Sequence, residues 1–244
     1  LTGGYIIKID KPTGGLGYDW SSQIQPLNAG SQLINYAFHY PKQDEILPAQ
    51  AAYIENHVTD FETNLNGPNF KDLTTGYRSF IDVPSFIDFF IINELNKNVD
   101  GFRLSTYFYK DKDSKGGKMI MGPIWDFNLA FGNANYCDGS LTNGWATDFN
   151  YVCPNDPWLI PFWWDRLSQD SSYNNQLKCR WENLRLTKLH LDTLLNYIDT
   201  LAVYLNESQQ RNFQRWPVLG TYVWPNDFIG TDYTSEVNYL KSWI

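Results

Sequence analysis

The spacing of apolar residues changes along the chain and predicts strands mainly in the first half and helices in the second. Residues 5–10 are β-branched and aromatic, which is typical of a strand. Residues 12–45 are rich in Gly, Pro, Asn and Gln and predict irregular structure with short strands. From position 48 to position 65 the apolar residues roughly follow a helical period, and Gly67-Pro68 ends that helix.

A second helix is predicted to begin at residues 82–85 and to end near residues 96–98, because apolar side chains recur at helical spacing between them. Asp82 is a suitable N-cap, and Pro84 fits the first turn. The helix is apolar on most sides, so we expect it to lie buried at the centre of the fold.

A β-hairpin is predicted next, because residues 104–109 and 118–121 have strand composition and the Gly-containing stretch 111–117 forms a turn between them. The last third of the chain is helical, with segments predicted at 157–169, 173–185, 187–212 (Thr187 as N-cap) and 234–244. This order of elements favours the α+β class, or a mostly helical lobe with a small β element.

Composition narrows the class of protein further. The chain has 244 residues, of which 43% are apolar, and this is enough to bury a sizeable core. The net charge of −8 argues against a nucleic-acid partner, which requires a basic surface. The richest apolar run is interrupted by Asp88 and is far shorter than the roughly 20 residues of a membrane span, so no transmembrane segment is predicted.

The three cysteines divide into a pair and a single residue. Cys137 and Cys153 bracket a segment rich in Gly, Asn, Asp and Thr, and a disulfide between them would stabilise this long loop. Cys179 lies in a helical context, where we expect it to be buried and unpaired. Three reduced thiols in a cytosolic protein are the alternative. A zinc site is not favoured, because the histidines are scattered and no Cys-x-x-Cys occurs.

Two aspartates lie at equal distances from the turn of the predicted hairpin. Asp100 precedes the turn centre, near Asp113, by 13 residues, and Asp126 follows it by 13. Equidistant positions face one another in an antiparallel pair, so both carboxylates are expected at the open end of the hairpin. There, one could act as a general base and the other could bind a hard divalent cation. The spacing alone leaves open that both are turn or cap residues, since Asp is common beside Gly.

Several motifs between positions 82 and 132 point to a known family. They include Asn93-Glu94-Leu95, Asn98-Val99-Asp100-Gly101, Tyr107-Phe108-Tyr109-Lys110 and Gly122-Pro123-Ile124-Trp125-Asp126-Phe127-Asn128. Together they resemble the spore-coat-H (CotH) kinase family. The resemblance implies the mostly helical C-terminal lobe of an atypical protein-kinase-like fold, with a small β-hairpin element, and the capacity to phosphorylate proteins.

The resemblance also implies roles for individual residues. Asp100 matches the catalytic aspartate that orients and deprotonates the acceptor hydroxyl, and Asp126 matches the aspartate that holds Mg²⁺ on the phosphates of ATP. Ser105 stands where a kinase catalytic loop has its metal-binding Asn, and Asn128 stands where the family often has a second Asp. Asn128 can coordinate through its carbonyl oxygen. The implied cofactors are therefore ATP and Mg²⁺ or Mn²⁺, and the implied partner is a protein phosphoacceptor.

The resemblance further implies how the chain is organised and where it acts. We expect residues 1–45 to form a hinge-like strand and an irregular lead-in, and residues 46–244 to form a helical kinase-like C-lobe. The chain would then be a piece that lacks most of the N-lobe, and it is not expected to bind ATP tightly on its own. The version of the family with Cys137 is similar to exported bacterial members, which implies an envelope or extracellular site.

A non-catalytic module of the same fold is the alternative function. Such an envelope or surface protein would bind a glycan or a protein through its aromatic side chains, which make up 17% of the chain. Convergence of Asp100 and Asp126 on an open cleft would favour phosphotransfer, whereas burial of both in salt bridges would favour the module.

Overall fold

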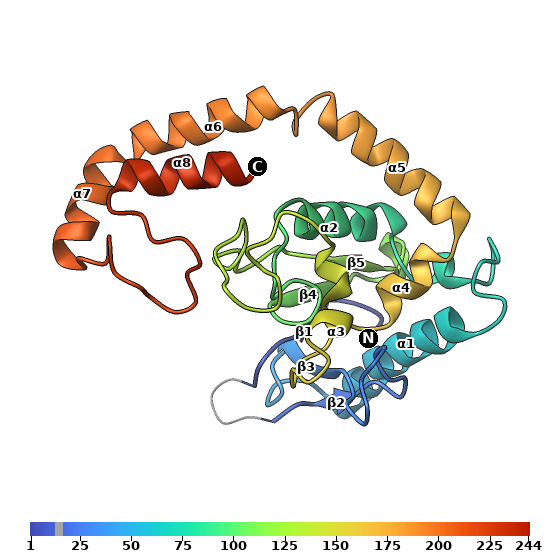
Figure 1. Cartoon of the computed structure of the whole chain (residues 1–244). Coiled ribbons are helices and arrows are strands. Elements are labelled where there is room, and N and C mark those ends of the chain that lie inside the picture. Colours follow the sequence, from blue (N-terminus) through green and yellow to red (C-terminus); the bar gives the residue numbers. More distant parts are fainter. Residues whose placement is uncertain (13–16) are drawn as a thin grey trace.

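An antiparallel sheet with helices packed on one face forms the centre of the molecule. The computed structural model describes residues 1–12 and 17–244, so positions 13–16 of the predicted irregular lead-in lie outside the described residues. Among the described residues the sheet has five strands in the order β2-β3-β1-β4-β5 (Figure 1). Their bounds are β1 Tyr5–Ile9, β2 Trp20–Ser21, β3 Asn35–Tyr40, β4 Thr106–Lys110 and β5 Met119–Met121. The α+β class is thus confirmed, with a β element larger than a hairpin.

The hairpin formed by β4 and β5 is confirmed, but its register differs from the prediction. Tyr109 lies opposite Ile120, which puts the midpoint of the ladder between positions 114 and 115 rather than at 113. The difference arises because a 3-10 helix, η2 (Asp113–Lys115), and the left-handed Gly116 (φ 102°) occupy the tip. The sequence pattern predicted the position of the turn, but it did not predict the 3-10 helix within it.

The two helices predicted in the first half are present with nearly the expected bounds. α1 spans Pro48–Asn66, and α2 spans Val83–Leu95 with Asp82 as its N-cap residue. The Asp82 side chain makes no capping hydrogen bond, and the Ser85 hydroxyl instead donates to the Asp82 carbonyl at 2.7 Å. α2 contributes six buried residues, which confirms the predicted central helix.

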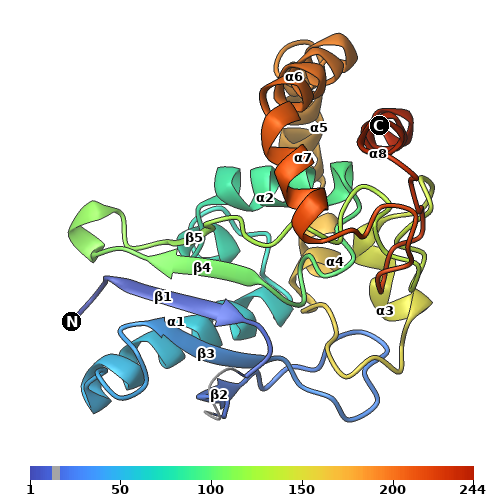
Figure 2. The same ribbon diagram turned by 90° about the vertical axis from the view of Figure 1, so that its left-hand side faces the viewer.

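Trp163 joins the sheet to the helices at the centre of the core. Its ring contacts Tyr36 of β3, Phe108 of β4, Phe61 of α1 and Phe86 of α2, with centroids between 5.3 and 6.4 Å apart. Because one ring touches all four elements, α1 and α2 cover the same face of the sheet (Figure 2). Aromatic packing of this kind accounts for much of the high aromatic content.

The last third of the chain is helical, as predicted, but it is divided differently. Its helices are α4 Trp163–Ser168, α5 Ser171–Arg185, α6 Leu191–Tyr204, α7 Asn206–Arg215 and α8 Tyr233–Trp243. The single helix expected over 187–212 is therefore α6 and α7. Thr187 is not its N-cap, because its hydroxyl donates to the Asn183 carbonyl at the end of α5, and His190 caps α6 instead.

Helices α6 to α8, residues 191–244, form a C-terminal arm. Figure 1 shows α5 and α6 leading away above α2, with α8 running alongside α6. These three arm helices have no buried residue within the described structure. The arm returns to the body at Gly132, whose carbonyl accepts a hydrogen bond from the Tyr239 hydroxyl at 3.4 Å.

Short elements complete the described chain: η1 Tyr77–Ser79, η3 Ala146–Asp148 and α3 Phe149–Val152. None of the helices in the described part combines the length and apolar character needed to cross a membrane.

The predicted disulfide is confirmed, and the prediction for the remaining cysteine is wrong. Cys137 and Cys153 are bonded, with Cα atoms 5.7 Å apart, and they tie the loop after β5 to the end of α3. Cys179 is exposed rather than buried. Its helix, α5, packs on the body through another face, which carries Leu177 and Trp181.

Glu62 of α1 is a buried carboxylate held by neutral donors. It accepts hydrogen bonds from Tyr36 (2.6 Å), Ser22 (2.8 Å) and Trp163 (2.9 Å). Burial raises the pKa of Glu62 above 4.5, and the hydrogen bonds only partly offset this effect. The folded state therefore binds the Glu62 proton more tightly than the unfolded state does.

Glu62 should therefore stabilise the folded state most at low pH. Its contribution to the free energy of unfolding should decrease as the pH rises from about 4.5. We expect the stability difference between wild type and Glu62→Gln to favour wild type most at acidic pH and to shrink toward neutral pH. Denaturant unfolding across this range measures it. Glu207→Gln, at an exposed side chain, is the control and should give a difference that does not change with pH.

Removing the disulfide should destabilise the fold. The double variant Cys137→Ser/Cys153→Ser opens a loop with a sequence separation of 16, for which chain entropy predicts a loss of about 3 kcal/mol. Denaturant unfolding under non-reducing conditions measures this loss. Cys179→Ser is the matched control and should leave the unfolding midpoint unchanged; equal stability of all three proteins would contradict the prediction.

Candidate functional site

Asp10 and Ser105 meet where β1 ends and β4 begins. The strands pair antiparallel with Ile9 opposite Thr106, so the residue after β1 and the residue before β4 become neighbours. The Ser105 backbone N–H points to Asp10 Oδ1, with nitrogen and oxygen 3.4 Å apart. Ser105 has a left-handed backbone (φ 48°), which turns the chain from the preceding loop into the strand.

Asp126 lies beside the same strand ends. The β4–β5 ladder finishes with the bond from the Gly122 N–H to the Tyr107 carbonyl (2.8 Å), and Asp126 follows on an irregular segment. Its backbone is also left-handed (φ 63°), a conformation that Asp tolerates better than most residues. The Ser105 hydroxyl faces Asp126 Oδ2 at 3.4 Å, and the Asp126 side chain is exposed.

The negative charges of Asp10 and Asp126 both act on one neighbouring side chain, Tyr107. Burial first, and then the negative charges of Asp10 and Asp126, raise the pKa of the half-buried Tyr107 phenol. Two carboxylates, one hydroxyl and solvent therefore share a small surface at the end of the sheet. Oxygen donors of this kind suit a hard divalent cation.

Asp100 follows α2 and occupies a different setting. Its Oδ1 forms an ion pair with Arg103 Nη2 at 2.5 Å and accepts a hydrogen bond from the Tyr136 hydroxyl at 3.1 Å. The Asp100 side chain retains 19% of its exposure. Within the described residues both contacts use Oδ1, which leaves Oδ2 open to solvent or to a substrate hydroxyl.

Arg103 is buried and anchors the Asp100 loop. Its Nε donates to the Val99 carbonyl (2.8 Å), and its Nη1 donates to Asp156 (3.0 Å) and to the Trp158 carbonyl (3.2 Å). The guanidinium also stacks on the Phe149 ring, 3.9 Å from the centroid. Two carboxylates, those of Asp100 and Asp156, thus compensate the buried charge of Arg103. A buried charge without such partners would be strongly destabilising.

The structure brings some of the expected residues together and leaves others apart. Ser105 and Asp126 are in contact. The ladder register does not put Asp100 directly opposite Asp126, and no hydrogen bond joins the two among the described residues. Asn128 is exposed; its backbone carbonyl accepts a hydrogen bond from Asn133, and its side chain makes no described bond to Asp126.

The donor set fits a cation that is bound largely by a substrate. The described residues contain no cluster of three or more His, Cys, Asp or Glu side chains that could hold a metal by itself. Mg²⁺ is commonly held by one or two carboxylates, several waters and substrate phosphates. Asp126, Ser105 and Asp10 supply that kind of incomplete, oxygen-only set.

Sequence reasoning missed three residues that shape the site: Asp10, Arg103 and Tyr136. Asp10 could have been found by pairing the strand at residues 5–10 with the strand that starts near Ser105, because that pairing places it at the hairpin mouth. The i,i+3 spacing of Asp100 and Arg103 was the local signal for that ion pair, whereas Tyr136 lies 36 residues from Asp100 and gives no local signal.

Comparison with protein-family models matches the family described as CotH kinase protein over residues 2–244. Since this match covers almost the whole chain, the protein belongs to the CotH kinase family. A search of curated proteins gives no match, and a search of solved structures gives none either. Family membership makes this a kinase-like protein and confirms the resemblance seen in the motifs.

Loss of Arg103 should destabilise the fold strongly. Arg103→Met leaves Asp100 and Asp156 without their buried cation, and breaking a buried pair typically costs about 3–5 kcal/mol. Arg180→Met is the matched control, because Arg180 pairs with Asp88 at the surface and such pairs contribute less than about 1 kcal/mol. Denaturant unfolding measures both variants, and similar losses in the two would contradict the assigned anchoring role.

Proposed function

We propose that the protein is an atypical kinase-like phosphotransferase that uses ATP and Mg²⁺ or Mn²⁺ to phosphorylate a hydroxyl group of a protein. The observation that carries the proposal is the exposed, left-handed Asp126 beside Ser105 and Asp10 at the end of the sheet. Membership of the CotH kinase family supports the same chemistry.

The residues divide the work between cation binding and proton transfer. Asp126, with the Ser105 hydroxyl beside it and Asn128 two residues further along the chain, would hold the divalent cation, and Asp10 adds a further carboxylate. When bound, the cation neutralises charge on the transferring phosphate. Asp100 orients the acceptor hydroxyl and takes its proton, and Arg103 keeps its carboxylate fixed.

The expected organisation of the chain is part of this proposal. β1 is proposed as the hinge-like strand of residues 1–45, and residues 46–244 as the kinase-like C-lobe. Asp10, which directly follows β1, supports a position for that strand next to the site. The sheet itself takes strands from both parts, because β1 pairs with β4.

An exported location, in the envelope or outside a bacterial cell, is also proposed. The Cys137–Cys153 disulfide supports it, because disulfides persist mainly in oxidising compartments.

A non-catalytic surface module is the second candidate, and one feature favours it. Asp100 is engaged in an ion pair with a buried arginine, as a structural carboxylate would be. Trp216 and Trp224, 57% and 69% exposed, would then contact a protein or glycan partner. Trp163 and Trp164 cannot take that role, because they are buried in the core.

Phosphotransfer is tested by incorporation of radiolabelled phosphate from ATP by the full-length protein with Mg²⁺ or Mn²⁺. We expect Asp100→Asn and Asp126→Asn each to lower the rate at least about a hundredfold, because general-base and cation-binding groups contribute effects of this size. Asp60→Asn, on the exposed surface of α1, is the control and should retain the wild-type rate. Absence of phosphate incorporation by the folded wild-type protein would overturn the proposal in favour of the surface module. Wild-type rates in the folded Asp100 and Asp126 variants would instead overturn the roles assigned to these two residues.

A further inference from the structure

Tyr136 connects Asp100 to a part of the chain that the proposed mechanism does not use. Its hydroxyl donates to Asp100 Oδ1 at 3.1 Å, and its ring stacks on Trp224 with centroids 6.0 Å apart and planes 9° from parallel. Trp224 lies on the loop between α7 and α8, in the C-terminal arm. One phenol therefore touches the candidate base on one side and the arm on the other.

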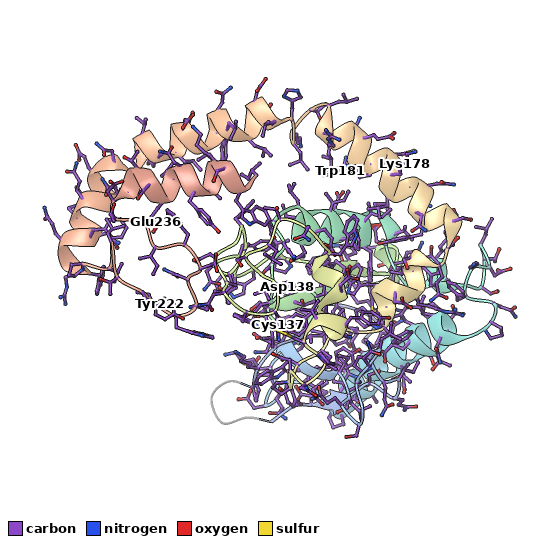
Figure 3. All side chains as sticks on the ribbon, viewed as in Figure 1. Cys137, Asp138, Lys178, Trp181, Tyr222 and Glu236 are labelled. Atoms are coloured by element: carbon purple, nitrogen blue, oxygen red, sulfur yellow. A yellow bond between two sulfur atoms is a disulfide. The ribbon has the colours of Figure 1, made fainter. Side chains whose placement is uncertain are left out.

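Two further contacts dock the arm loop beside Tyr136. The Asn135 N–H donates to the Pro225 carbonyl at 2.8 Å, and the Asn135 side-chain amide donates to the Tyr222 hydroxyl at 3.1 Å. Figure 3 shows Tyr222 on the arm loop and Cys137 on the body segment that this loop approaches. Three residues of the arm loop, Tyr222, Trp224 and Pro225, thus contact two consecutive residues, Asn135 and Tyr136.

The disulfide also fixes the segment that contains Asn135 and Tyr136. Cys137 directly follows Tyr136 and is bonded to Cys153, close to Asp156, which pairs with Arg103. The Asp156 N–H also donates to the Cys153 carbonyl at 3.1 Å. Both groups that hold Asp100 Oδ1, namely Arg103 and Tyr136, therefore depend on segments joined by this bond.

We infer that Tyr136 is a positioning residue for Asp100 and that the arm loop around Trp224 holds Tyr136 in place. The inference rests on the proposed function, in which Asp100 is the base. A donor fixed on Oδ1 limits rotation of the carboxylate and presents Oδ2 to the acceptor hydroxyl. The C-terminal arm then supports the reaction without touching the substrate.

The surroundings of Tyr136 keep its hydroxyl protonated, so that it can remain a hydrogen-bond donor to Asp100. Burial first and the negative charge of Asp100 second raise the pKa of Tyr136, while Arg103 lowers it and Asp156 raises it further. The phenol consequently stays protonated over the pH range in which phosphotransfer would be assayed.

Tyr136→Phe removes the donor and keeps the stacked ring, so it tests positioning with little effect on packing. We expect kcat for phosphotransfer to fall roughly tenfold, with KM for ATP nearly unchanged. Tyr233→Phe, which removes a hydroxyl bonded to the Ala202 carbonyl within the arm, is the control and should move neither quantity.

Trp224→Leu tests the support from the arm. It should lower kcat in the same direction as Tyr136→Phe, and the double variant should lose little more than the worse single variant, since both act through one hydrogen bond. Fully multiplicative losses, or an unchanged kcat in Tyr136→Phe, would overturn the inference.

A measurement independent of activity separates this inference from the proposed function. 3-Fluorotyrosine placed at position 136 of the full chain should change its ¹⁹F resonance in both Asp100→Asn and Trp224→Leu, but not in Asp60→Asn. An unchanged resonance in the first two variants would show that the Asp100–Tyr136–Trp224 contacts do not exist in solution. If the wild type transfers no phosphate, the proposed function fails, and the role of Tyr136 as a catalytic positioning residue fails with it even where the fluorine signals respond.

Discussion

The buried guanidinium of Arg103 is the interaction on which the arrangement of the site depends. A cation in the interior costs several kcal/mol unless carboxylates and carbonyls surround it. Asp100 lies three residues away and Asp156 lies 53 residues away, so satisfying this one charge forces two distant segments together. The loop after α2 is therefore positioned by charge compensation as much as by apolar packing.

Backbone strain gathers around the same region. Residues other than glycine with left-handed backbones occur at Phe102, Ser105, Asp126 and Cys137. Such conformations each cost on the order of 1–3 kcal/mol and persist only where neighbouring structure enforces them. Here the sheet edge, the Arg103 ion pairs and the disulfide provide that enforcement. These backbone conformations lower the stability of the fold but fix the directions of the side chains, a combination that is typical of functional sites.

Features set by neighbouring residues could be predicted from the sequence, and features set by distant ones could not. α1 and α2 follow from apolar periodicity and breakers, and the disulfide follows from loop composition between two cysteines. The pairing of β1 with β4 joins strands about a hundred residues apart, so Asp10 was not placed in the site. The exposure of Cys179 was missed because a helical period does not show which face of α5 another element covers. The motifs singled out Asp100 and Asp126 as candidates, but a 3-10 turn at the hairpin tip shifted the ladder from the register that the sequence predicts.

The sparse packing of the C-terminal arm has a consequence for the order in which the molecule opens. Helices that bury no residue separate from a protein at a lower free energy than its central sheet does. Transient detachment of the arm would release the Trp224 stack and the Tyr239 contact while Trp163 still held the core together. Thermal fluctuation thus reaches the surroundings of Asp100 well before global unfolding, and exchange of the Asn135 amide, which is bonded to the Pro225 carbonyl, would follow the arm rather than the sheet.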